Sequence, residues 1–78
     1  GAIPENMPEV SIGGAPVGIL KVLREAGLVA SGAEAQRNIE QGGVRVDGVR
    51  VEDRTISLAP GTYVVQVGKR KFARVTLS

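Results

Sequence analysis

Apolar side chains recur at the three- and four-residue spacing of an α-helix between residues 16 and 26. In the stretch PVGILKVLREA the charged residues fall mostly off the apolar stripe. Pro16 suits the first turn of a helix, and Gly27 is typical of the position just after a helix end. The pattern therefore predicts a first helix at about 16–26.

A second helix is predicted by its own start signal. Ser31 followed by Glu34 matches the capping box, in which two side chains bond free backbone N–H groups at a helix start. The Ala-rich stretch AEAQRNIEQ follows and ends at Gly42-Gly43. Because only about four residues separate the two helices, we expect them to form a compact helical hairpin.

The period of the pattern changes to two after Gly43. The stretch GVRVDGVRV reads as two short strands joined by Asp47-Gly48, a strong signal for a two-residue hairpin turn. We expect its four valines to share one face, toward the core. Arg45 and Arg50 then lie opposite each other on the other face.

The rest of the chain supplies further strands and an N-terminal arm. Residues 55–58 are a candidate short strand, and 63–67 and 71–77 are strands joined by a tight turn. Tyr63 and Phe72 are assigned to the core. Residues 1–15 are interpreted as a linker or arm with an extended stretch at 10–12, and 16–78 as the domain. The expected fold is α+β, a two-helix hairpin packed on a small, mainly antiparallel sheet of four to five short strands.

The composition argues against autonomous chemistry. The chain has no Cys and no His, so it lacks thiolate chemistry and the commonest general base. Its serines have no histidine to activate them, its carboxylates are not clustered, and the phosphate-loop spacing is absent. We therefore expect no catalytic residue, metal or cofactor in this chain. With no Cys, a reducing cytoplasm is the default location. No apolar run approaches the roughly 20 residues that span a membrane, so we expect no membrane partner.

The cations matter through their type and place more than through their number. The net charge is only +2, but seven of the ten cations are arginines, which bind phosphate through two parallel hydrogen bonds. Residues 54–78 carry five cations and no acid. Facing like charges are unfavourable, and a phosphate between Arg45 and Arg50 would reverse the sign of that interaction. The alternative is that these side chains spread into water and cover apolar surface.

Several further cations lie on exposed faces of the predicted elements. Lys21 and Arg24 share a face of the first helix, and Arg37 follows a helix N-terminus that favours anions. Because the second helix leads directly into the hairpin, we expect its N-terminus, Arg37 and the hairpin to form one continuous basic surface. The turn at 69–71 is equally well explained as a charged edge that prevents aggregation. The candidate RNA-binding residues are Lys21, Arg24, Ser31, Arg37, Arg45, Arg50, Lys69, Arg70 and Lys71.

Residues 21–51 resemble the RNA-binding domain family named after small-subunit ribosomal protein S-four. That family has a helix ending in an Ala-Gly-Leu-like stop, then Ser, then Glu-Ala-x-Arg, then Gly-x-Val-x-Val-Asn-Gly and a second strand. Asp47 stands here in place of the common Asn, and Gly32 and Gln36 in place of common arginines. The matching positions are Ala26, Gly27, Leu28, Ser31, Glu34, Ala35, Arg37, Gly43, Val44, Val46, Asp47, Gly48 and Val51.

The flanks are similar to the C-terminal domain of bacterial tyrosyl-tRNA synthetases. The stretch IPENMPEVSI at 3–12 resembles the linker before that domain, and VVQVGKRKFARVTL resembles its closing strands. The resemblance implies a module that holds tRNA-Tyr, while a separate catalytic domain of the same parent chain activates tyrosine with ATP. It implies a tyrosine-tRNA ligase as the parent and no enzymatic activity for this fragment.

Two alternatives remain open at this point. The first is an S-four-like domain of another RNA-handling protein, such as a pseudouridine synthase or a ribosome-associated factor. The second is a protein-interaction module, which would need an exposed apolar patch. Two aromatic residues are too few for a base-stacking platform, so we expect recognition of RNA backbone and shape, and no DNA partner.

Overall fold

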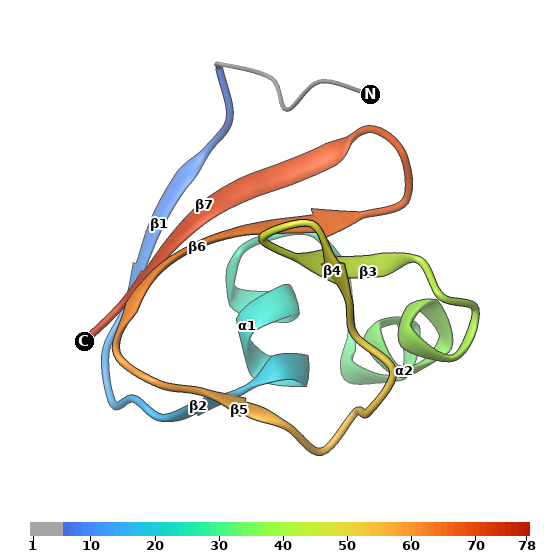
Figure 1. Ribbon diagram of the computed structural model, residues 1–78, viewed down its shortest axis with the longest axis horizontal. Helices are drawn as coiled ribbons and strands as arrows, with labels where there is room; N and C mark the ends of the chain where they lie inside the picture. Colours follow the sequence, from blue (N-terminus) through green and yellow to red (C-terminus); the bar gives the residue numbers. More distant parts are fainter. Residues whose placement is uncertain (1–5) are drawn as a thin grey trace.

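The computed structural model describes residues 6–78 and shows the strands and helices of an α+β fold (Figure 1). The predicted fold class is confirmed. The elements in chain order are β1 (Glu9–Ile12), β2 (Val17–Gly18), α1 (Ile19–Glu25), α2 (Gly32–Glu40), β3 (Val44–Val46), β4 (Val49–Arg50), β5 (Ser57–Leu58), β6 (Gly61–Val67) and β7 (Lys71–Leu77). Within residues 6–78, neither helix is long and apolar enough to cross a bilayer.

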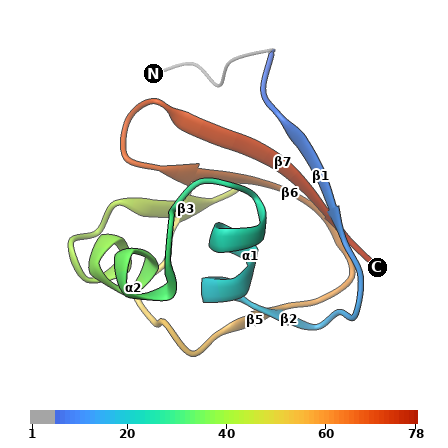
Figure 2. The ribbon, with the colours of Figure 1, turned by 180° about the vertical axis from the view of Figure 1, so that it is seen from behind.

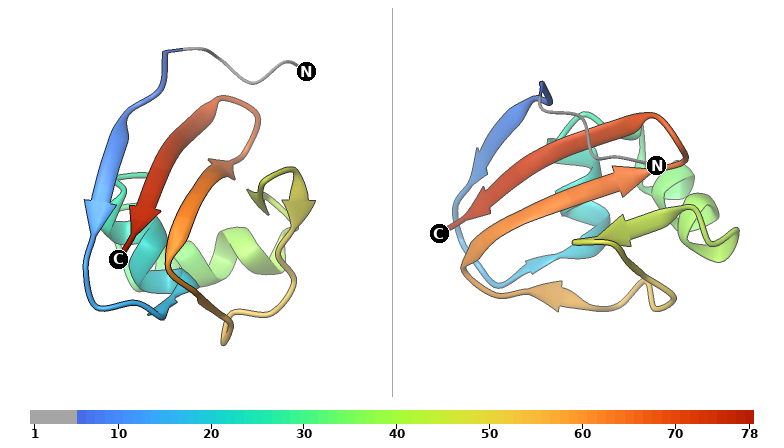
Figure 3. Two further views of the ribbon diagram at one scale, coloured as in Figure 1. Left: turned by 60° about the vertical axis from the view of Figure 1, so that its left-hand side comes forward. Right: turned by 45° about the horizontal axis from the view of Figure 1, so that its top comes forward.

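The main sheet has five strands in the order β1-β7-β6-β3-β4 (Figure 3). Its neighbours are antiparallel except β1 and β7, which run parallel with Glu9 opposite Arg74 and Ile12 opposite Leu77. Residues 1–5 of the predicted arm lie outside the described residues, and the rest of the arm contributes an edge strand, which confirms the extended stretch expected at 10–12. β2 and β5 pair separately as a two-stranded antiparallel ribbon.

Both helices lie on the same face of the sheet, as Figure 2 shows from behind. The inward residues of the central strands, such as Val44, Val65 and Val75, are fully buried. They pack with Ile19 and Leu23 of α1 in one core cluster. Because the helices cover only this face, the opposite face of the sheet meets solvent.

The first helix begins three residues later than predicted. Val17 and Gly18 pair with Leu58 and Ser57 of β5 instead, which holds their backbone extended. The amide of Ile19 continues this contact by donating to the carbonyl of Ile56 at 2.9 Å. The placement of Pro16 in the first helical turn was therefore wrong, because a strand partner 40 residues away competes with the local helical pattern.

The second helix begins as predicted. Ser31 is its N-cap, and its hydroxyl accepts from the backbone amide of Glu34 at 3.2 Å. The Glu34 carboxylate reaches back one residue further than the capping box specifies, to the amide of Ala30 at 3.4 Å. Ala35 and Ile39 form the buried face of the helix, as expected.

The Asp47-Gly48 hairpin is confirmed in register, with Arg45 opposite Arg50. Both turn residues have positive φ, 50° and 83°, which a type I′ turn requires. The expectation that all four valines face the core was wrong for Val49, which is 70% exposed. Val49 lies beside the turn on the edge strand, where no neighbouring element covers it.

Candidate nucleic-acid interface

A row of four side chains crosses the solvent-facing side of the sheet. The strand registers place Arg50 opposite Arg45, Arg45 opposite Gln66, and Gln66 opposite Phe72. Their chain neighbours Val44, Val65, Val67 and Ala73 are buried on the helix side. Since side chains alternate along a strand, the four in the row point away from the core.

The two facing arginines differ in their charge partners. Arg50 forms a 2.7 Å ion pair with Glu52, two residues further along the chain. Its side chain also lies over Gly42, where a methyl group would meet the Arg50 Cδ at 3.4 Å. Within residues 6–78 no carboxylate lies within 4.0 Å of the Arg45 guanidinium. Glu52 therefore offsets the like-charge pair, and Arg45 keeps its charge available.

The row borders a shallow groove of about 810 Å³. Half-buried Val64, Gln66 and Phe72 line it together with the cations Arg45 and Lys69. Within residues 6–78, the remaining lining residues are four glycines, Gly42, Gly43, Gly48 and Gly68, and none is a carboxylate. The charge of this lining therefore favours an anion.

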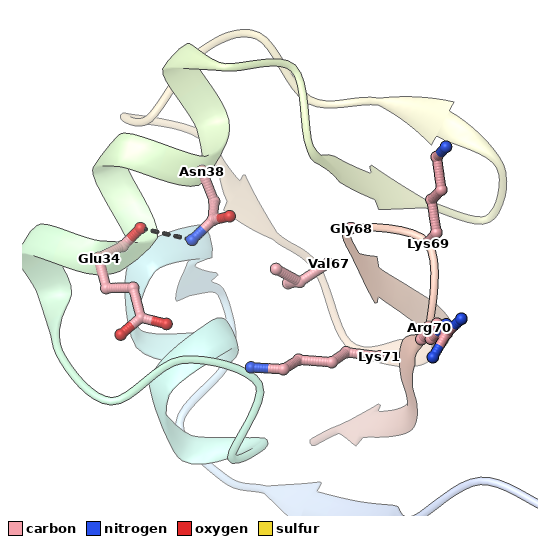
Figure 4. A pocket seen from close by; sticks show the side chains of 7 residues that line it. All are labelled: Glu34, Asn38, Val67, Gly68, Lys69, Arg70 and Lys71. Atoms are coloured by element: carbon pink, nitrogen blue, oxygen red, sulfur yellow. Dashed lines mark hydrogen bonds between the residues drawn. The ribbon is translucent and has the colours of Figure 1, made fainter.

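A second, smaller hollow of about 360 Å³ lies between α2 and the turn after β6. Figure 4 shows Glu34 and Asn38 on its helix side, with the Asn38 amide donating to the Glu34 carbonyl at 2.8 Å. The Lys71 side chain extends toward α2, and the Lys69 side chain extends in a different direction. Lys69 borders both hollows, so the turn joins the sheet surface to the surface of α2.

The other candidates are spread over the helix layer. Arg37 is exposed on α2, and Ser31 caps the end of α2 that is distant from the hairpin. Lys21 and Arg24 are exposed on α1, on the helix side of the sheet and not on the face that carries Arg45. The structure thus brings Arg45 and Lys69 together in the groove, places Arg70 and Lys71 at the second hollow, and leaves the α1 pair on the helix side of the sheet.

Sequence reasoning missed three side chains of the groove, Val64, Gln66 and Phe72. The assignment of Phe72 to the core was wrong, because the strand alternation puts it on the same side as Arg74 and Thr76. That alternation is visible in KFARVTL and could have shown this. Tyr63 does pack against the core, and its hydroxyl donates to the Ala59 carbonyl at 2.8 Å.

Binding is the chemistry that these groups offer. The groove supplies a guanidinium, an ammonium, an amide and an aromatic ring, groups that can bind an anionic or aromatic ligand. Within residues 6–78 no three acidic side chains gather closely enough to hold a metal ion. The pKa of Asp53 is lowered, first by a hydrogen bond from the Thr55 hydroxyl and then by one from the Thr55 backbone N–H, but Asp53 lies outside the groove.

Comparisons with known proteins agree with one another. Residues 2–75 match the family described as "Tyrosine--tRNA ligase SYY-like C-terminal domain". The chain is 78% identical over 77 residues to a tyrosine–tRNA ligase of Bordetella pertussis and 59% identical over 78 residues to one of Cupriavidus pinatubonensis, and it spans 19% of the length of each. The solution structure of a tyrosyl-tRNA synthetase C-terminal domain aligns with a TM-score of 0.77 and 26% identity, covering 92% of this chain and 79% of that one.

Proposed function

The chain belongs to the family of tyrosine–tRNA ligase SYY-like C-terminal domains, and from this premise we propose that it binds tRNA-Tyr for a tyrosine–tRNA ligase. In this proposal a catalytic domain elsewhere in the parent chain activates tyrosine with ATP in the cytoplasm. The fragment itself holds the RNA and needs no cofactor.

One observation carries the proposal. Arg45 and Lys69 line the groove, Lys69, Arg70 and Lys71 line the second hollow, and within residues 6–78 none of these cations has a carboxylate within 4.0 Å. Cations without internal partners are free to neutralise phosphates and to release the counterions that surround RNA. Arg54 and Arg74, by contrast, have carboxylates of Glu40 and Glu9 at 3.8 Å.

Arg37, Lys21 and Arg24 extend the proposed contact onto the helices. Arg37 lies on α2 three residues after Glu34, so the two side chains are neighbours on the helix surface. Glu34 lines the second hollow. The α1 pair is on another side, so it would contact a different segment of a large RNA. Arg50 contributes less to binding in this proposal, because Glu52 already neutralises it.

The protein-interaction alternative finds less support. Such a module would need a contiguous apolar patch on its surface. Within residues 6–78, Val49 is the only large apolar side chain that is strongly exposed. A single valine at a hairpin tip is an ordinary feature of a protein surface.

Salt-dependent binding of tRNA tests the proposal. We expect the chain to be retained on immobilised tRNA-Tyr at low salt and to elute by about 0.3 M salt, as counterion release predicts. Replacing Arg45 or Lys69 by Gln should each reduce the slope of log affinity against log salt by about one.

Arg74→Gln is the matched control for both variants. Arg74 is exposed on the same face of the sheet, but it pairs with Glu9 at 3.8 Å and lies outside the groove. Its loss should leave the salt slope unchanged. Equal slopes in all four proteins would show that the proposed surface does not contact phosphate.

A further inference from the structure

The groove on the solvent-facing side of the sheet contains side chains that a surface binding only phosphates would not need. Its cations Arg45 and Lys69 are exposed, whereas Phe72, Val64 and Gln66 are half-buried. Phosphate contacts need charge and no aromatic ring. The aromatic and amide groups beside the cations therefore require a different explanation.

From this combination we infer that the groove holds one unstacked nucleotide of the RNA, with its base on the Phe72 ring and its phosphates at Arg45 and Lys69. The inference rests on the proposed function and specifies which part of the RNA this face recognises. The volume of about 810 Å³ suits a nucleotide, because small-molecule sites generally measure about 300–1,000 Å³.

The spacing of the row fits the size of a nucleotide. Arg45 on β3 and Phe72 on β7 are separated by one strand, β6. Neighbouring strands lie about 4.8 Å apart, so the two backbones are roughly 10 Å apart. A flexible arginine side chain spans much of that distance, which lets it meet a phosphate while the base contacts the ring.

Gln66 is fixed in a way that suits reading a base edge. Its Nε2 donates to the carbonyl of Gly68 at 2.8 Å, which orients the amide between Arg45 and Phe72. Within residues 6–78, no donor binds the Gln66 Oε1. An amide with a free acceptor and a second N–H can pair with the Watson–Crick edge of an exposed base.

Charge and access favour a nucleotide over a peptide segment. Among residues 6–78, the lining includes two cations and no carboxylate. Gly48 and Gly68 have nothing within 4 Å of the position that a Cβ would take, so the rim is low at both residues. A base can enter from the open side, while an anionic backbone is held at the rim.

The test compares two RNA probes with the chain. One is a fully paired hairpin, and the other is the same hairpin with a single-stranded extension that contains 2-aminopurine. We expect the extended probe to bind more tightly and its fluorescence to change as the base stacks on Phe72. Phe72→Leu should weaken its binding by roughly 5- to 100-fold, the range typical of base–aromatic stacking, and leave the paired probe unchanged.

Two further measurements separate stacking from a loss of folding. Phe72→Tyr keeps the ring and should retain the binding preference. In the unaltered chain, NMR resonances of the Gln66 side-chain amide should shift with the extended probe and not with the paired one.

The outcomes distinguish the two proposals. Equal binding of both probes, with no effect of Phe72→Leu, overturns the nucleotide site but leaves RNA binding intact. An equal loss with both probes in Phe72→Leu also overturns the site. Absence of binding to either probe at low salt overturns the proposed function itself.

Discussion

A neighbouring carboxylate changes the electrostatic energy of the two facing arginines in the β3–β4 hairpin. Arg45 and Arg50 are directly opposite, a placement that costs free energy when both charges are uncompensated. The carboxylate of Glu52 is 2.7 Å from Arg50 and offsets that cost. Arg50 and Glu52 therefore form an ion pair, and the neighbouring Arg45 remains available to bind an anion.

Removing the carboxylate should expose the repulsion between the arginines. We expect Glu52→Gln to lower the free energy of unfolding by about 0.2–1 kcal/mol, because the ion pair is exposed and such pairs contribute little. Urea unfolding at low and high salt measures this, and the loss should shrink as salt screens the charges. A loss that is independent of salt would contradict the electrostatic explanation. Glu25→Gln, at an exposed carboxylate outside the ion pairs of residues 6–78, is the control.

The loop after β4 contains a carboxyl group with a perturbed pKa. The Thr55 hydroxyl donates to the Asp53 Oδ1 at 2.5 Å and the Thr55 backbone amide at 2.8 Å, and both bonds lower the pKa of Asp53. A lowered pKa means that the ionised form stabilises the fold. This contribution is present above the ordinary pKa of Asp53 and is lost as the pH falls through the lowered value.

We expect Thr55→Val to raise the pKa of Asp53 toward its ordinary value, since only the backbone bond remains. NMR titration of the Asp53 carboxyl carbon in both proteins checks this. Thr55→Ser keeps a hydroxyl and should leave the pKa low. An unchanged pKa in the valine variant would show that the side-chain bond has no such effect.

At the scale of elements, α2 depends on a local signal at its start. Its N-cap bond from the Glu34 amide to the Ser31 hydroxyl satisfies one of the free N–H groups of the first turn. We expect Ser31→Ala to lower the free energy of unfolding by about 1 kcal/mol, as measured by chemical denaturation.

Ser31→Asp is the control for the cap, because a carboxylate also accepts from the helix start. It should retain most of the stability that the alanine variant loses. If both variants are equally destabilised, the hydroxyl does not act as a cap. RNA binding is measured separately, because Ser31 is also a candidate contact residue.

Elements with local signals could be predicted from the sequence, and elements that depend on a distant partner could not. The Asp47-Gly48 turn and the Ser31 cap are complete within a few residues, so their structures follow from short-range rules. β2 is set by its pairing with β5, which overrides the helical pattern around Val17. The prediction that Val49 is buried was wrong, because burial of a residue on an edge strand depends on whether another element covers it.

The same distinction applies to the candidate site. Arg45 and Lys69 could be proposed from charge and turn chemistry alone. The groove requires the register that sets Arg45, Gln66 and Phe72 side by side on three strands. A single sequence shows the alternation within each strand, but it does not show which residues of different strands become neighbours.

At the scale of the whole molecule, the N-terminal strand completes the core. Ile12 is 8% exposed and belongs to the core cluster, while its neighbour Ser11 points to solvent. We expect Ile12→Ala to lower the free energy of unfolding by about 2–4 kcal/mol, within the range for large-to-small core substitutions. Ser11→Ala, on the same strand, should change it by less than about 0.5 kcal/mol. Equal effects on urea unfolding would show that β1 is not part of the cooperative core.

The parallel pairing of β1 with β7 also has a mechanical consequence. The N-terminal end of β1 and the C-terminal end of β7 lie at opposite ends of their shared ladder, because Glu9 faces Arg74 and Ile12 faces Leu77. A pull that separates residues 9 and 77 therefore acts along the strands and shears every rung of the ladder at the same moment. A force applied at one end of the ladder would instead break the same hydrogen bonds one after another.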